Sequence, residues 1–300
     1  MRLGALLSCV ATAPMLIAAA QPIRLQPSSK WVVDYAENSC RLARSFGEGK
    51  DSVLLNLESE AGMADMFVMG NPVSSTSDEV SGRFLPVQKK PMKGESAQSP
   101  NGPVVLWHYV SLLPDDLAEK YEKRERAPAY RLGVRPPPID LAEKAEIKAK
   151  RLEFAAKATE LEVDAHRHII LETGPLGDAI KAFDDCIKYS LRDWGVDSDV
   201  DDKIVRRAWL SNFQDVFTPS LYPPGMAVRG EQSDVKFRIL IDATGKVTKC
   251  TALSHFKEKS FEQVVCDTFM KRAHFQPAEL ADGTKVASYW ANRVIFRMGR

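Results

Sequence analysis

The sequence predicts an α+β fold: a β-rich N-terminal domain with one late helix, then a small C-terminal domain with the order strand, strand, helix, strand. Three observations predict it. Short runs rich in β-branched and aromatic residues recur between residues 31 and 113. A strongly amphipathic helical pattern follows at 175–195. Residues 222–300 then alternate apolar and polar side chains on both sides of a second helical pattern.

The composition is typical of a soluble globular protein, and the 300 residues suggest two domains. The chain is 44% hydrophobic and 27% charged, which is ordinary. Its 41 Lys and Arg residues almost balance its 40 Asp and Glu residues, so nothing indicates nucleic acid or an acidic membrane surface as a partner. We expect an N-terminal domain at 29–195, a linker at 196–214 and a C-terminal domain at 215–300.

Residues 1–20 have the pattern of a secretory signal peptide: an arginine, an apolar run and three alanines. We expect cleavage after Ala20. Two alternatives stay open. A retained membrane anchor is disfavoured by the short apolar run and by Pro14, because a spanning helix needs about 20 apolar residues. A lipoprotein signal at Cys9 would place the cysteine after almost no apolar stretch.

Export changes how the cysteines are interpreted. After cleavage the chain keeps Cys40, Cys186, Cys250 and Cys266, and an even number in an oxidising compartment predicts disulfides. Four cysteines allow three connectivities, and the sequence alone does not choose among them. Grouping by candidate domain favours the pairs 40–186 and 250–266. None lies in a C-x-x-C pair or has a histidine at metal-ligand spacing, so we expect no metal site.

The N-terminal domain contains one long amphipathic helix in this interpretation, at 175–195, after a series of strands. Strands are expected within 31–46 and at 52–58, 66–70, 82–87, 104–113 and 167–174. Residues 88–103 are polar and carry glycine and proline, which predicts a loop. Residues 114–140 are expected to be irregular. Residues 141–163 remain open between helix and strand, because helix propensity is high but no clean apolar stripe exists.

The C-terminal domain has the clearest pattern. Residues 234–242 place four apolar side chains on one face and Lys236 and Arg238 on the other, as in a half-buried strand. A tight turn leads into a second strand that pairs back as a hairpin. A helix is expected from Ser260 to Arg272, since Ser260 and a following glutamine form a capping box. The last strand is expected at 288–298.

These elements carry a family resemblance. The matching stretches are "YPPGMAVRG" (222–230), "VKFRILIDATGKV" (235–247), "SFEQVVCDTFMKRAHFQPA" (260–278) and a glycine at 283. In this order and spacing, residues 222–298 resemble the C-terminal domain of TonB, the periplasmic energy transducer of Gram-negative bacteria. The resemblance implies a periplasmic location in the Gram-negative envelope.

The rest of the chain departs from that family. TonB has an uncleaved N-terminal anchor with a histidine that meets a proton-driven motor complex, whereas residues 1–30 here contain no histidine. TonB also has a long proline-rich rod, whereas proline here clusters only in "RPPPI" at 135–139. The resemblance therefore covers the receptor-binding end, and the motor end has no visible counterpart.

The sequence predicts a binding protein and not an enzyme. It contains none of the common nucleophile, zinc-protease, P-loop or dinucleotide motifs, and no cofactor is expected. A small sheet with a free edge can accept an extended peptide as an extra strand. In the TonB family that peptide belongs to an outer-membrane transporter. The predicted function is thus a periplasmic, non-enzymatic module that binds a peptide or protein and is linked to TonB-dependent transport across the outer membrane.

The partner-binding edge would be the last strand, with Arg293, Ile295 and Arg297 as candidate residues. The N–H of Ile295 could join the ladder. Arg293 and Arg297 share a face and could steer an acidic peptide. They could instead keep the edge soluble and prevent aggregation. The alternative function is a soluble envelope protein that binds cell-wall material or another partner without energy transduction.

Overall fold

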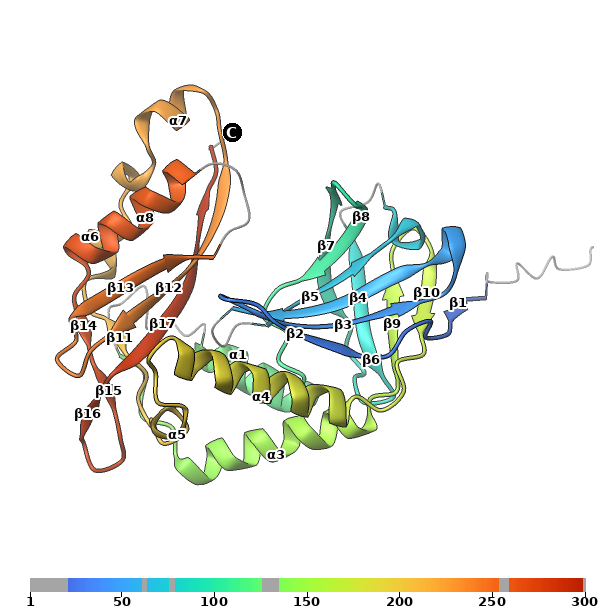
Figure 1. Cartoon of the computed structure of the whole chain (residues 1–300), viewed down its shortest axis with the longest axis horizontal. Helices are drawn as coiled ribbons and strands as arrows, with labels where there is room; N and C mark the ends of the chain where they lie inside the picture. Colours follow the sequence, from blue (N-terminus) through green and yellow to red (C-terminus); the bar gives the residue numbers. More distant parts are fainter. Residues whose placement is uncertain (1–20, 61–63, 76–78, 126–134, 254–258, 299–300) are drawn as a thin grey trace, which may run out of the picture.

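The protein folds into two connected parts with separate hydrophobic cores (Figure 1). The computed structural model describes residues 21–60, 64–75, 79–125, 135–253 and 259–298. The fold class is α+β, as predicted, with a large β-rich N-terminal part and a small C-terminal part of strands around one long helix. The predicted signal peptide at 1–20 lies outside the described residues.

The N-terminal part is built on a ten-stranded sheet with the order β1-β10-β9-β6-β7-β8-β5-β4-β3-β2. The strands are β1 Ile23–Leu25, β2 Val32–Tyr35, β3 Cys40–Phe46, β4 Val53–Ser59, β5 Ala64–Met69, β6 Val80–Leu85, β7 Met92–Ser99, β8 Gly102–Trp107, β9 Glu160–Asp164 and β10 His168–Leu171, with 3-10 turns at Gly49–Asp51 and Asn71–Val73.

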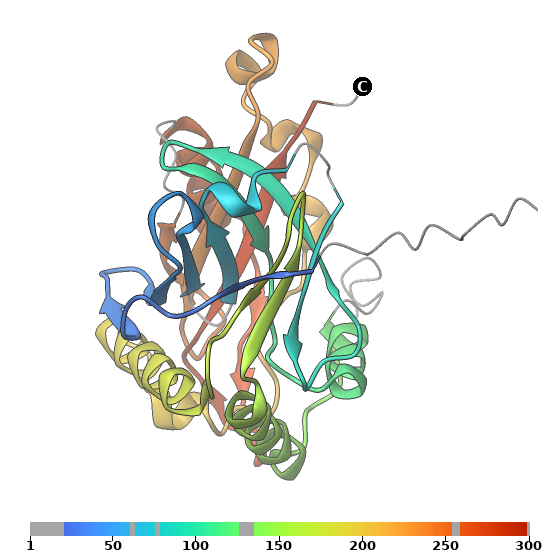
Figure 2. The same ribbon diagram turned by 90° about the vertical axis from the view of Figure 1, so that its right-hand side faces the viewer.

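The sheet curls strongly, as the end-on view in Figure 2 shows. The chain between β1 and β2 completes the curl, because Ser28 N–H donates to Ser45 O (2.9 Å) and Gly47 N–H donates to Gln26 O (2.8 Å). Since β1 also pairs with β10, both ends of the sheet are joined through this segment. The inward-facing side chains, among them Leu42, fill the interior.

Helices α1 (Asp115–Glu125), α3 (Leu141–Lys157) and α4 (Gly177–Asp193) lie together below the sheet in Figure 1. Helix α3 begins where the Asp140 carboxylate accepts the Ala142 N–H at 2.6 Å. Helix α4 follows its predicted amphipathic pattern and buries Ile180 and Phe183 against the strands.

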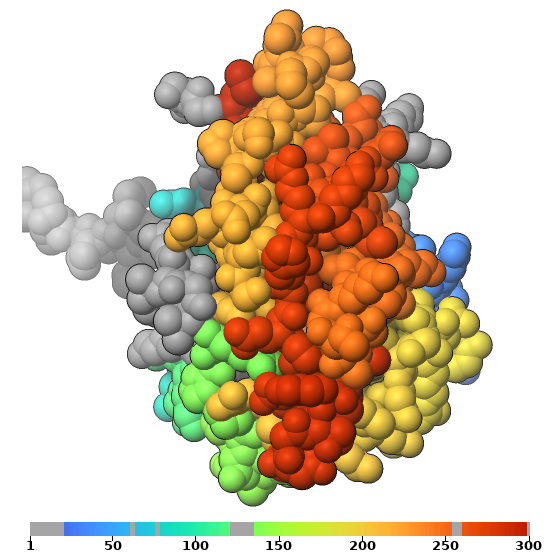
Figure 3. Space-filling model, turned by 90° about the vertical axis from the view of Figure 1, so that its left-hand side faces the viewer, coloured from blue at the N-terminus to red at the C-terminus, as the bar shows by residue number. Residues whose placement is uncertain are grey.

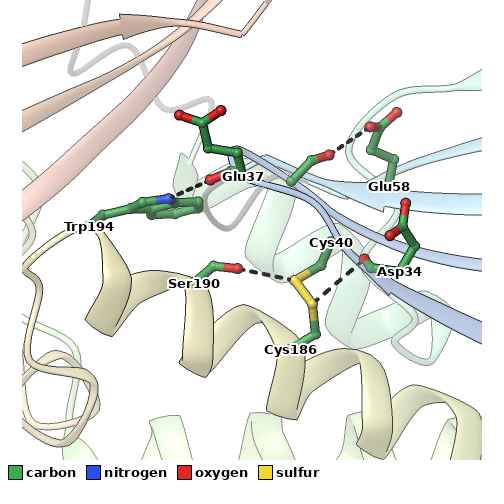
Figure 4. Close-up of a disulfide and its surroundings, with 8 residues drawn as sticks. Asp34, Glu37, Cys40, Glu58, Cys186, Ser190 and Trp194 are labelled. Carbon is green, nitrogen blue, oxygen red and sulfur yellow. Dashed lines mark hydrogen bonds between the residues drawn. A yellow bond between two sulfur atoms is a disulfide. The ribbon is translucent and has the colours of Figure 1, made fainter.

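A disulfide between Cys40 and Cys186 ties β3 to α4, with the two Cα atoms 6.0 Å apart (Figure 4). The Ser190 hydroxyl lies 3.3 Å from the Cys40 sulfur, and the Trp194 indole at the end of α4 donates to the Glu37 carbonyl at 3.1 Å. The disulfide and the Trp194 hydrogen bond thus attach helix α4 to the β2–β3 hairpin at two points.

Three N-terminal segments differ from the sequence prediction. Residues 88–103, predicted as a loop, contain strand β7, and the charged stretch after 113 contains helix α1. The open segment at 141–163 divides into α3 and β9. The glycine that suggested a loop has a packing role: a side chain at Gly94 would come within 2.8 Å of the Trp107 indole nitrogen. Trp107 covers the strand there, so only glycine fits.

In the C-terminal part, strands β12 (Ser233–Ile241), β13 (Val247–Ala252) and β17 (Ser288–Phe296) form an antiparallel sheet that helix α8 (Lys259–Arg272) covers on one face. Figure 3 looks onto the α8 side. A second disulfide, Cys250–Cys266, joins β13 to α8 across a sequence separation of 16. Both disulfides are the pairs that grouping by domain favoured.

The shorter elements are α5 Ser198–Asp201, β11 Trp209–Leu210, α6 Phe213–Val216, a 3-10 turn at Pro219–Leu221, α7 Pro224–Val228, β14 Phe275–Gln276, β15 Ala278–Glu279 and β16 Lys285–Val286.

The C-terminal core begins before the predicted boundary at 215. Ala208 and Leu210 are fully buried in it, and Leu210 on β11 pairs with Phe275 on β14. The sequence predicts a linker there because the acidic, polar run at 196–202 precedes these residues.

A C-terminal fragment should therefore need β11 for full stability. We expect residues 204–300 to be more stable than residues 215–300 by about 2 kcal/mol, because the shorter fragment loses the burial of Leu210. Both fragments keep the Cys250–Cys266 bond, so urea denaturation of the oxidised proteins compares them directly. Equal midpoints would contradict the inclusion of β11 in this core.

Candidate functional site

The candidate binding element is β17, an edge strand of the C-terminal sheet. The sheet order is β13-β12-β17, and no other strand of the described residues pairs with the outer side of β17. It pairs with β12 over all nine residues, from Ser288 opposite Ile241 to Phe296 opposite Ser233. This strand coincides with the edge predicted at 288–298.

The hydrogen-bond pattern of β12 decides which backbone groups of β17 point outward. Lys236 O accepts from Leu253 N–H at 2.8 Å, so the even-numbered residues of β12 turn their backbone groups toward β13. Its odd-numbered residues therefore face β17, and Val235 lies opposite Val294. Hence the odd-numbered residues of β17 direct their N–H and C=O groups away from the sheet: Tyr289, Ala291, Arg293 and Ile295.

One outward N–H is already occupied. Arg293 N–H donates to the side-chain oxygen of Asn292 at 2.8 Å, which agrees with its outward direction. Such local protection is one way in which a protein blunts a sheet edge. An added strand would have to displace the Asn292 side chain at this position.

The two predicted arginines differ in their surroundings. The Arg293 guanidinium makes a bidentate contact with Asp234, at 2.7 and 2.6 Å, and only 10% of its side chain is exposed. Its charge is therefore largely neutralised, and it does not act as a free steering cation. Arg297 follows the strand and is exposed, as is Ile295.

The sheet face opposite α8 is covered by the N-terminal part. Lys236 on β12 lies between two buried carboxylates of that part, 2.5 Å from Asp65 Oδ2 and 3.3 Å from Glu60 Oε2. Burial opposes the charge on Lys236, but the two carboxylates outweigh it and raise the pKa of Lys236. The ammonium group thus joins the two parts of the protein.

Asp65 receives three donors. Besides Lys236, the His108 Nδ1 atom lies 3.1 Å from Oδ2, and Tyr109 N–H donates to Oδ1 at 3.2 Å. Burial alone would raise the pKa of Asp65, but the contacts with His108 and Lys236 lower the pKa to about 2. Asp65 is therefore ionised at neutral pH and orders both the interface and the start of the segment after β8.

A second cation, Arg238, completes this interface. It is 2% exposed, its guanidinium lies 3.3 Å from the ring centroid of Trp194, and it donates to the side-chain oxygen of Asn38 at 3.1 Å. Burial lowers the pKa of Arg238 to about 10, so it stays charged at neutral pH. Trp194 ends α4, and Asn38 lies in the β2–β3 hairpin that the disulfide holds.

Sequence reasoning missed the interface residues Lys236 and Arg238. The alternation correctly placed both on the polar face of the strand, but polar faces are usually solvated, so no partner was expected. Glu60, Asp65 and Tyr109 gave no sequence signal. Their role depends on how the two parts pack, and no local pattern encodes it.

Comparison with known families identifies the C-terminal part. Its sequence matches the family model of the Gram-negative bacterial TonB protein C-terminal domain over residues 218–298. This family is associated with the Gram-negative envelope, is generally non-enzymatic and interacts with envelope proteins. No curated protein matches the chain.

Two further findings concern the described residues only. Their helices lack the combination of length and apolar character that a membrane crossing requires. Their His, Cys, Asp and Glu side chains form no group of three that could hold a metal ion.

The ion-pair network makes stability depend on pH. Because the pKa of Asp65 falls from 3.8 to about 2 on folding, its contribution is present above about pH 4 and is lost as the pH falls toward 2. We expect the stability difference between the wild type and Asp65→Asn to shrink by about 2 kcal/mol between pH 6 and pH 2. Urea denaturation across that range measures it. Asp267→Asn on α8 is the control, because exposed ion pairs such as Asp267–Lys271 contribute little to stability. If the stability difference between the wild type and Asp65→Asn does not change with pH, the ion-pair network is contradicted.

Proposed function

We propose that this protein is a periplasmic, non-enzymatic TonB-like module that binds an extended segment of another envelope protein along β17. The observation that carries the proposal is the outward direction of the backbone groups of Ala291 and Ile295 on an edge strand of nine residues. An extended peptide can continue the ladder there, and its main chain would supply most of the affinity. The match of residues 218–298 to the TonB C-terminal family supports this choice.

The partner that the family suggests is an extended segment of an outer-membrane transporter. Arg297 would then contribute an exposed positive charge next to the strand, and Arg293 would contribute mainly its backbone. The two disulfides are consistent with an oxidising compartment such as the periplasm.

A second candidate is a soluble envelope protein that binds cell-wall material or another partner without transmitting force. The observation in its favour is the docked N-terminal part. Lys236 fixes a compact body directly on the sheet face, where TonB itself has an extended rod. The two candidates share the β17 edge and differ in what is attached to it.

Strand addition predicts a specific effect of proline at the edge. Ile295→Pro removes an outward N–H without breaking a bond to β12, so the fold should persist while peptide binding weakens by about tenfold or more. Ile295→Thr keeps the N–H and should bind nearly as well as the wild type. Calorimetric titration would use heptapeptides with a glutamate at each end. Between the ends, polar residues would alternate with valine, leucine, phenylalanine or tyrosine.

Thermal unfolding of both variants controls for misfolding. Undiminished binding by a folded Ile295→Pro protein would mean that the edge does not pair with peptide. Failure of every peptide to bind the wild type at millimolar concentration would contradict the proposed function itself.

A further inference from the structure

The His108–Leu113 segment follows β8 and begins at the interface, where His108 and Tyr109 contact Asp65. Two of its residues have a left-handed backbone that non-glycine residues rarely adopt, Tyr109 at φ 59° and Leu112 at φ 51°. Such conformations cost energy and persist only where the surroundings enforce them, often at functional sites. Here the enforcement is visible: Tyr109 N–H is held by Asp65, and Val110 N–H donates to Ala64 O at 2.8 Å.

This backbone places the Tyr109 side chain beside the binding edge. Partial burial raises the pKa of the Tyr109 phenol, and among nearby charges the Arg293 cation acts on it most strongly, in the opposite direction. Asp234 and Lys236 also act on it, and both lie on the sheet face that the N-terminal part covers. The geometry agrees: Tyr109 N–H bonds to Asp65, and Asp65 pairs with Lys236, which lies opposite Arg293 of β17. Tyr109 therefore lies beside the β17 half of that face, and 49% of it remains exposed.

The charges near Tyr109 at the edge are paired with one another, and an exposed apolar side chain lies on the same face. Ile295 projects from the same sheet face, because it lies opposite Asp234 in the register, and it is 47% exposed. The neighbouring Arg293 and Asp234 neutralise each other. The face beside the edge thus combines an exposed aromatic residue, an exposed branched aliphatic residue and a pair of compensated charges.

We propose that the N-terminal part supplies a second wall of the peptide site through Tyr109, and that the bound strand carries an apolar or aromatic side chain facing it. The proposal rests on the proposed function, since it requires a strand along β17. Alternate side chains of an added strand point to opposite faces of the sheet. Only those on the N-terminal side can meet Tyr109, and a side chain opposite Arg293 or Ile295 would fill the space beside its ring.

The site would therefore select side chains at every second position and would favour an apolar residue at one of them. An acidic residue at that position would find Arg293 already paired. This selectivity belongs to the assembly of both parts, because Tyr109 comes from the N-terminal part and β17 from the C-terminal part.

The test uses the full-length protein and the alternating heptapeptides described above. Tyr109→Ala should weaken binding of the best peptide by about tenfold, whereas Tyr109→Phe should bind within about twofold of the wild type, because the ring makes the contact. Tyr189→Ala is the matched control: Tyr189 is 60% exposed on α4, and its loss should leave affinity unchanged.

A double-mutant cycle separates contact from indirect effects. Replacing the apolar peptide residues one at a time by alanine should reveal one position whose effect largely disappears in Tyr109→Ala. Additive losses at every position, or full affinity of Tyr109→Ala, would overturn the second wall. If the second wall is overturned but Ile295→Pro still abolishes binding, strand addition along β17 is supported and only the role of Tyr109 is rejected. If no peptide binds the wild type, both proposals fail.

Discussion

The ammonium group of Lys236, held between Glu60 and Asp65, is the contact on which the arrangement of this protein depends. It fixes the sheet face of the C-terminal part on the N-terminal part. With that face covered, Arg238 is buried against Trp194, and the segment carrying Tyr109 is held beside β17. The edge of β17 remains available for pairing, because the docking uses the face of the sheet and not its rim.

The contact is a costly one. Desolvating a cation and two carboxylates opposes folding, and the attraction between them offsets this only when the geometry is good and the remaining donors and acceptors are satisfied. His108 and the Tyr109 N–H provide such additional donors to Asp65. Apolar residues could join the two parts as strongly. We infer that the ion pairs instead define one orientation, because a shifted sheet would leave buried charges unpaired.

Much of the C-terminal part could be predicted from the sequence. The alternation at 234–242 and 288–298 identified both long strands, and the family resemblance agreed with their order. The long helix at 175–195 followed from its apolar stripe. In contrast, β7 was missed because Gly94 suggests a loop, although its absent side chain makes room for Trp107.

The candidate site was predicted only in part. Its strand followed from alternation, which is local, whereas the pairing of Arg293 with Asp234 depends on the register of two strands far apart in the sequence. The positions of Lys236 and Tyr109 depend on how two separately packed cores meet. Patterns within one sequence predict neither the strand register nor this packing, because residues that touch across such an interface have no regular spacing in the sequence.

Amide hydrogen exchange of the intact protein tests the central claim, an open β17 edge, most directly. The inward N–H groups of Trp290 and Val294 bond to β12, and the outward N–H groups of Ala291 and Ile295 have no strand beside them among the described residues. We predict that the outward pair exchanges about a hundredfold faster or more than the inward pair, and that a bound peptide slows the outward pair. Equal protection of all four amides in the free protein would mean that the edge is already covered, and would contradict the account.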